Sequence, residues 1–172
     1  DFYALQVMNT ILGGSFSSRL NQNLRETKGY TYGAGSGFEY RPLPGPFVAA
    51  AAVRADVTDS ALVEFLKELN GIRDSELARA KAYLTLSLPA EFETASQLAG
   101  QVAGLLLFGL PLDYYRSYVP RIMAVTAADV RRVARTYLHP DRMAVVVVGD
   151  AAALRPKLEA LGLGPIRPLE VR

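Results

Sequence analysis

The chain has 172 residues, half of them hydrophobic and 21% charged, which allows one domain with a sizeable core and argues against a disordered chain. A formal net charge of +2 is too small to indicate nucleic acid or an anionic membrane as a partner. The absence of cysteine excludes disulfides, thiolate nucleophiles and cysteine-ligated zinc.

Two helices are expected at the start of the chain. Residues 5–12 carry apolar side chains at helical spacing, and the glycine pair at 13–14 ends this helix. A second, shorter helix is expected to begin near Ser17, a good N-cap, and to end near the Lys-Gly pair at 28–29.

A pair of strands is expected next. Residues 30–40 mix aromatic side chains with glycine and serine, and residues 47–55 are rich in alanine and valine. Between them, residues 41–46 (RPLPGP) have the composition of a turn. The alanine run at 49–52 favours a helix by propensity alone. The flanking turns and the valines favour a strand, so we expect an antiparallel pair.

Two helices with N-capping residues should follow the hairpin. The first is expected to begin at Thr58 and to carry leucines on one face as far as Leu69. The second is expected to begin at Ser75, and Pro89 interrupts its pattern.

The rest of the chain is expected to be mainly helical up to a late strand. A helix is predicted for residues 94–108, a broken helix for residues 112–123 because Pro120 lies inside it, and an amphipathic helix after Thr126. The apolar run at 143–149 (MAVVVVG) predicts a strand buried on both faces. A short helix, residues 152–161, is expected after it.

These elements predict the fold class. Helices outnumber strands, so we expect an α+β fold: a two-layer sandwich in which helices pack on one face of an antiparallel or mixed sheet. Residues 1–172 are expected to form a single domain.

The residues needed for hydrolysis are missing from the sequence. His139 is the one histidine, and it lies just past a helix, where a structural role in the C-terminal turn is expected. A catalytic zinc takes several histidine or carboxylate ligands, yet no His-x-x-Glu-His motif is present. A Gly-x-Ser-x-Gly elbow is also absent. The residues alone therefore indicate an α+β domain without an evident active site.

A set of short segments points to a known family. They are residues 12–20 (LGGSFSSRL), 23–26 (NLRE), 29–33 (GYTYG), 78–81 (ARAK), 108–111 (FGLP), 125–130 (VTAADV) and 146–150 (VVVGD). This set resembles the C-terminal-type, non-catalytic domain of the insulinase or pitrilysin family of zinc metallopeptidases. The resemblance covers essentially the whole chain, and the block from LRE to GYTYG is its most specific part.

The resemblance implies a division of labour between two homologous α+β domains around a closed chamber. One half carries zinc on an inverted His-x-x-Glu-His helix with a later glutamate. The other half lacks zinc and contributes an arginine and a tyrosine to the substrate, and the matching positions are Arg25 and Tyr32. Residues 5–10 (LQVMNT) match the zinc-bearing helix without offering a ligand, so zinc is expected in the partner half.

Structural readings of the two residues stay open. Arg25 also fits a residue that neutralises the C-terminal end of a helix. Tyr32 also fits a half-buried strand residue, and Tyr30, on the other side of Thr31, competes with it for the substrate role.

The sequence thus predicts the zinc-free, substrate-binding half of a metalloendopeptidase, a chain that is not an enzyme on its own. Its partners would be a peptide substrate and a homologous zinc-bearing domain or subunit. The rivals are a degenerate scaffold subunit and a peptide-binding module without a hydrolytic partner. The loop at 13–18 is shorter than the glycine-rich loop of mitochondrial processing peptidase, which weakens presequence recognition as its role.

Two further expectations concern the ends of the chain and its location. Family domains of this type usually begin with strands before the first helix, and these strands are expected to be missing here. Neither a signal peptide nor an apolar run long enough to span a bilayer is visible. We therefore expect a soluble bacterial protein of the cytoplasm or the periplasm.

Overall fold

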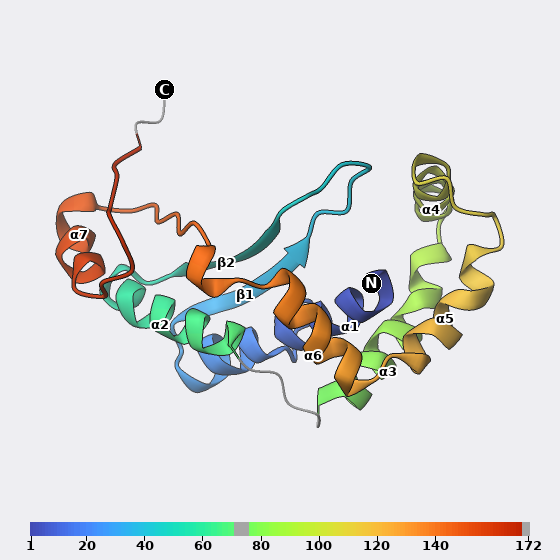
Figure 1. Ribbon diagram of the computed structural model, residues 1–172, viewed down its shortest axis with the longest axis horizontal. Helices are drawn as coiled ribbons and strands as arrows, with labels where there is room; N and C mark the ends of the chain where they lie inside the picture. The colour runs from blue at the N-terminus through green and yellow to red at the C-terminus, as the bar shows by residue number, and fades with distance from the viewer. Residues whose placement is uncertain (71–75, 170–172) are drawn as a thin grey trace.

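The computed structural model of the chain describes residues 1–70 and 76–169 as helices arranged around one β-hairpin (Figure 1). The elements, in chain order, are α1 (Phe2–Leu12), η1 (Asn21–Thr27), β1 (Thr31–Phe38), β2 (Phe47–Val53), η2 (Ala55–Val57), α2 (Thr58–Leu69), α3 (Leu77–Ser87), η4 (Leu88–Phe92), α4 (Ala95–Leu107), α5 (Tyr114–Ala124), α6 (Ala127–Tyr137), η5 (Pro140–Arg142) and α7 (Ala151–Glu159). The hairpin and α1 lie in the middle of the molecule, with α7 at one end and α4 at the other. The predicted α+β class is confirmed.

Helix α1 forms the centre of the hydrophobic core. Its side chains Val7, Met8 and Leu12 are almost completely buried, and the helix contacts α3, α5 and α6. Ile122 of α5 and Val133 of α6 are fully buried in the same cluster. Burying a side chain of this size contributes about 1.5–3 kcal/mol. The helix predicted from the apolar spacing of residues 5–12 is therefore confirmed, with its glycine end.

The predicted second helix is present, but its main part, η1, is wound as a π-helix. A backbone hydrogen bond at the C-terminal end of η1 has the spacing of a π-helix. The Lys28 amide donates to the Asn23 carbonyl, five residues back, at 2.9 Å. The Thr27 hydroxyl likewise donates to the Gln22 carbonyl at 2.8 Å. Such π-turns are uncommon and often accompany functional sites.

The predicted antiparallel hairpin is confirmed. β1 and β2 pair from Phe38↔Phe47 at the turn to Thr31↔Val53 at the open end.

The helices predicted to begin at Thr94 and after Thr126 are present as α4 and α6, and each begins with a complete capping box. No helix within the described ranges is long and apolar enough to cross a bilayer.

The predicted strand at residues 143–149 is wrong. This segment takes no strand pairing, and its valines are open to solvent, with Val146 72% and Val148 95% exposed. A strand needs a neighbour to accept its backbone hydrogen bonds, and the part of the chain that the structure describes places no strand beside it.

Three smaller predictions concern a helix break and two N-caps. The break predicted at Pro120 is wrong, because α5 continues through this residue and loses only the bond that its missing N–H would make. Thr58 is not the N-cap of α2. It is the first residue of that helix, and its hydroxyl contacts the Arg54 and Ala55 carbonyls. The predicted cap at Ser75 lies outside the described residues.

Candidate functional site

Tyr32 lies in a β-bulge at the beginning of β1. The pairs made by Thr31 and Ala34 leave two residues of β1 between them but only one residue of β2. Tyr32 and Gly33 therefore both oppose Ala52. A bulge redirects the side chains of the bulged strand, and Tyr32 is 98% exposed. The phenol is thus presented to solvent from the edge of a paired strand.

The side chain of Thr31 holds this bulge together. Its hydroxyl oxygen accepts a hydrogen bond from the Gly33 amide at 3.1 Å and lies 2.6 Å from the Ala52 carbonyl, to which it can donate. A bulge interrupts the regular ladder, and these contacts satisfy backbone groups at the interruption. The backbone that carries Tyr32 is therefore fixed.

Arg25 lies on η1, with its side chain 33% exposed. Its Nε is 3.6 Å from the Glu26 carboxylate, and its guanidinium carbon is 4.3 Å from the centroid of the Phe16 ring. Phe16 is itself 64% exposed. Sequence reasoning did not select Phe16, although the residue lies inside the matched segment 12–20.

Asn21 joins the three segments that carry these side chains. Its Oδ1 accepts a hydrogen bond from the Ala34 amide of β1 at 2.9 Å, and its Nδ2 donates to the Ser15 carbonyl at 3.2 Å. Asn21 itself belongs to η1 and is buried. This residue was also missed by sequence reasoning, because a buried asparagine in a predicted helix gives no signal of its long-range partners.

The loop at residues 13–18 lies directly against β1. The Ser36 amide donates to the Gly13 carbonyl at 3.2 Å. A Cβ on Gly13 would lie 2.4 Å from the Ser36 Oγ and 2.5 Å from the Ser36 nitrogen, so the approach requires glycine. The loop is therefore clamped in place beside the strand that carries Tyr32.

The structure places the two predicted residues on adjoining elements with separate contacts. η1 leads directly into β1, and the Tyr30 amide donates to the Leu24 carbonyl at 2.8 Å across the junction. Arg25 contacts Phe16 and Glu26, whereas Tyr32 points into solvent. Tyr30 packs against the core cluster, so Tyr32 is the tyrosine of this block with a free phenol.

The tyrosines of α5 form an aromatic cluster with Tyr3 of α1. Tyr3, Tyr114 and Tyr118 lie ring to ring, with centroids 5.9–6.3 Å apart. Burial raises the pKa of Tyr118, and burial together with the nearby Tyr118 raises the pKa of Tyr40 to about 12. The phenols of Tyr40 and Tyr118 therefore stay protonated at neutral pH.

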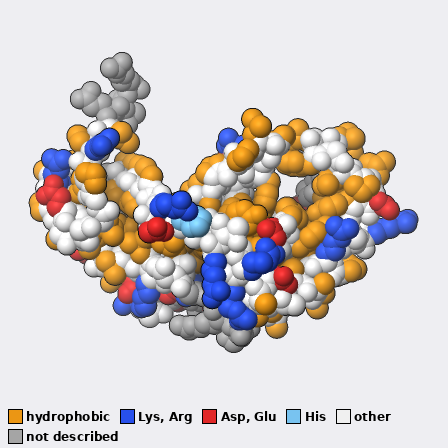
Figure 2. Space-filling view, in the orientation of Figure 1, with side chains coloured by type: hydrophobic (Ala, Val, Ile, Leu, Met, Phe, Trp, Pro, Cys, Tyr) orange, Lys and Arg blue, Asp and Glu red, His pale blue; other side chains and the backbone are white. Residues whose placement is uncertain are grey.

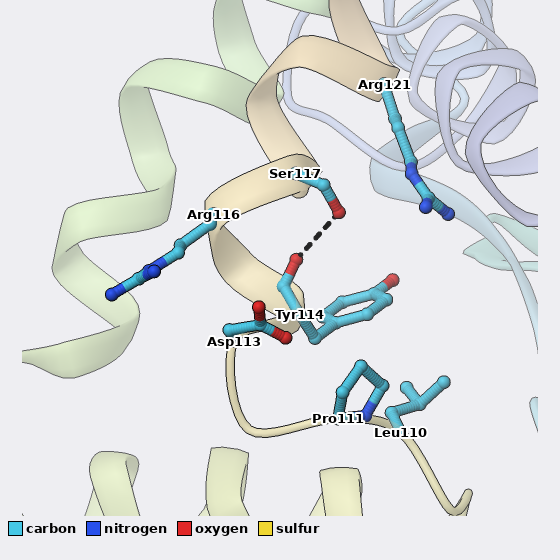
Figure 3. A pocket seen from close by; sticks show the side chains of 7 residues that line it. All are labelled: Leu110, Pro111, Asp113, Tyr114, Arg116, Ser117 and Arg121. Carbon is cyan, nitrogen blue, oxygen red and sulfur yellow. Dashed lines mark hydrogen bonds between the residues drawn. The ribbon is translucent and has the colours of Figure 1, made fainter.

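A pocket of about 430 Å³ opens beside the same helix (Figure 3). It is lined by Leu110, Pro111, Asp113, Tyr114, Arg116, Ser117 and Arg121. The Ser117 hydroxyl donates to the Tyr114 backbone carbonyl at 3.1 Å, and Arg116 and Arg121 extend in different directions. No residue of α1, η1 or β1 lines the pocket, so it is distinct from the surface that carries Arg25 and Tyr32.

The residues present do not fit a zinc ion. His139, visible near the centre of Figure 2, has its Nε2 3.2 Å from the Thr136 carbonyl, which confirms its predicted place in a helix C-terminal turn. Within the described ranges, no three histidine, aspartate or glutamate side chains are grouped to hold a metal. Residues 5–10 of α1, which match the zinc-bearing helix of the other half, have Gln6 and Asn9 as their long polar side chains and contain no histidine or carboxylate.

Comparison with known proteins agrees with this picture. Residues 1–84 match the family model for the peptidase M16 inactive domain. An uncharacterized zinc protease of Streptomyces coelicolor is 32% identical over 166 residues, which cover 93% of this chain and 33% of the relative. A non-peptidase homolog from Helicobacter pylori is 24% identical over 162 residues, covering 87% of this chain and 36% of the homolog.

A solved structure extends the match beyond the first half of the chain. The crystal structure of a peptidase M16 inactive domain from Pseudomonas fluorescens aligns with a TM-score of 0.72 at 29% identity, over 83% of this chain and 35% of that chain. The fold is therefore that of a peptidase M16 inactive domain. These matches confirm the resemblance to the inactive domain of the peptidase M16 family, and the chain spans about a third of the length of the relatives it matches.

Proposed function

We propose that this chain is the zinc-free, substrate-binding half of a zinc metalloendopeptidase, and that Arg25 and Tyr32 contact the peptide opposite a His-x-x-Glu-His half. The observation that carries the proposal is the 98% exposure of Tyr32 on a fixed bulge, next to the helix of Arg25, in a chain of the inactive-domain family. A tyrosine with only a packing role would bury its ring.

The chemistry of the two side chains suits this division. Zinc in the partner half polarises the scissile carbonyl and activates a water molecule. The oxyanion that develops there, and the substrate backbone, need fixed donors. Arg25 offers a planar, permanently charged guanidinium, and Tyr32 offers a neutral phenolic donor. Both are held on hydrogen-bonded backbone, so little reorganisation is required on binding.

The exposed apolar side chains of this chain support a large partner surface. Leu98, Leu106 and Leu107 of α4 are 49%, 71% and 65% exposed, and hydrophobic side chains gather over this end of the molecule (Figure 2). Large exposed apolar patches are typical of interaction surfaces. A homologous zinc-bearing domain is the partner that the proposed function requires.

Substitution of the two residues tests the proposal in the complete peptidase, zinc-bearing half included. Arg25→Ala and Tyr32→Phe should each lower kcat/KM by about 100-fold, because each removes a preorganised donor. Arg135→Ala and Tyr83→Phe, on exposed faces of α6 and α3, are the matched controls and should retain activity. Wild-type turnover in both site variants would refute the assigned roles.

A scaffold subunit without hydrolytic activity is the second candidate, and the similarity to a non-peptidase homolog favours it. On this alternative, Arg25 and Tyr32 are remnants of an ancestral site. Co-purification separates the two functions: a peptidase half should bring down a His-x-x-Glu-His protein or be joined to one, and a scaffold should bring down unrelated subunits.

A further inference from the structure

Among the described residues, Arg25 has no strong ion pair that would fix the direction of its guanidinium. Its carboxylate neighbour, Glu26, is adjacent in sequence and has a half-exposed side chain 3.6 Å away. Exposed pairs of this kind contribute little, because solvent screens them and both side chains lose rotamer freedom. A substrate-binding arginine therefore needs another contact to hold it.

Phe16 provides such a contact. The Cζ of Arg25 lies 4.3 Å from the Phe16 ring centroid, well inside the range of about 6 Å in which a cation is attracted to an aromatic face. The ring is 64% exposed, so burial in the core does not account for its position. The position of the ring instead places its aromatic face against the Arg25 guanidinium.

The turn that carries Phe16 is held on both sides of the ring. On one side, the Ser15 hydroxyl donates to the Thr10 carbonyl, and the Ser15 carbonyl accepts from the Asn21 side chain, both at 3.2 Å. On the other side, Ser18 is buried, and its amide donates to the Ser15 carbonyl at 3.1 Å. The ring is thus presented from a hydrogen-bonded turn of fixed shape.

We propose that Phe16 is a positioning residue that holds the Arg25 guanidinium by stacking, so that its donors face the substrate. This inference rests on the proposed function of Arg25. The aromatic face is the required property. A tyrosine or tryptophan at position 16 would keep it, and a leucine of similar bulk would remove it.

Kinetics of Phe16→Leu and Phe16→Tyr in the complete peptidase test the inference. Phe16→Leu should lower kcat about two- to fivefold, the range expected for a stacking contact at an exposed site, with a smaller change in KM. Phe16→Tyr should retain wild-type kcat. In an Arg25→Ala background, Phe16→Leu should cause no further loss, because its effect acts through the guanidinium. The thermal midpoint should stay unchanged, since the ring is exposed.

The outcomes separate this inference from the function it rests on. If Arg25→Ala lowers turnover and Phe16→Leu does not, the positioning role is overturned and the proposed function stands. If Phe16→Leu and Phe16→Tyr lower kcat equally, or if the losses of Phe16→Leu and Arg25→Ala multiply, the ring acts in another way and the inference is also wrong. If Arg25→Ala itself has wild-type turnover, the proposed function and the inference both fail.

Discussion

Asn21 is the single side chain on which the geometry of the candidate site depends most. Its amide group is buried and is bonded to the Ala34 amide on one side and to the Ser15 carbonyl on the other. Removing a buried partner costs more than the hydrogen bond contributes, because the remaining group is left desolvated. The helix of Arg25, the strand of Tyr32 and the loop of Phe16 all meet at this residue.

Replacing Asn21 by alanine should therefore destabilise the fold. We expect Asn21→Ala to lower the free energy of unfolding by about 1–3 kcal/mol, since the buried Ala34 amide loses its partner and the Ser15 carbonyl keeps only the Ser18 amide. Urea denaturation followed by circular dichroism measures this loss. Asn70→Ala is the control, because the Asn70 side chain is exposed where it bonds the Leu66 carbonyl, and the loss there should be about 0.5 kcal/mol. Equal losses in the two variants would contradict the structural role.

The sequence singled out Arg25 and Tyr32 as candidate site residues, but it did not predict how the structure presents them. The matched blocks gave the positions of Arg25 and Tyr32. The strand propensity of tyrosine instead suggested a half-buried Tyr32, and this is wrong, because the bulge turns the side chain into solvent. A bulge depends on how two strands pair. The residue types of either strand alone do not determine this pairing.

At the scale of elements, the close approach of the loop at 13–18 to β1 is the tightest fit in the site. Gly13 has a φ of −154°, which any residue can adopt, so conformational freedom does not explain the glycine. The reason is space: an added Cβ would meet the backbone of Ser36 and Gly35 at 2.5 and 2.9 Å.

Gly13→Ala should consequently force the loop away from the strand. We expect a loss of about 2 kcal/mol in unfolding free energy, the cost typical of overpacking against backbone. Gly104→Ala is a matched control in α4, where nothing lies within 4 Å of the added Cβ. That variant should gain about 0.5–1 kcal/mol, because alanine is favoured over glycine in a helix interior. Denaturant midpoints of both variants give the comparison, and a neutral Gly13→Ala would show that the loop is not clamped.

Elements with local signals were predictable, and elements that need a distant neighbour were not. The helices predicted to begin at Thr94 and after Thr126 are present, and each begins with a capping box encoded within four residues. The apolar run at 143–149 has the composition of a buried strand, but a strand also requires a partner. The π-winding of η1 was likewise not predicted; this helix leads into β1 through the bond from the Tyr30 amide to the Leu24 carbonyl.

At the scale of the whole molecule, the chain exposes apolar side chains and the candidate site residue Tyr32. Leucines of α4, the valines at 145–148 and Tyr32 are exposed, and the hairpin that carries Tyr32 lies in the middle of the molecule (Figure 1). The chain spans about a third of the length of its relatives. These features are consistent with the proposed function, in which the domain works against a second surface and the peptide lies between the two halves.

The most direct test is the turnover of a peptide by the complete peptidase that carries Arg25→Ala and Tyr32→Phe together, measured at full zinc occupancy. Zinc content should stay at the wild-type level while kcat/KM falls by at least about 100-fold, because donors are lost from this half and the metal is held by the other. Wild-type turnover in the double variant, or loss of the zinc itself, would contradict the proposed division between the two halves.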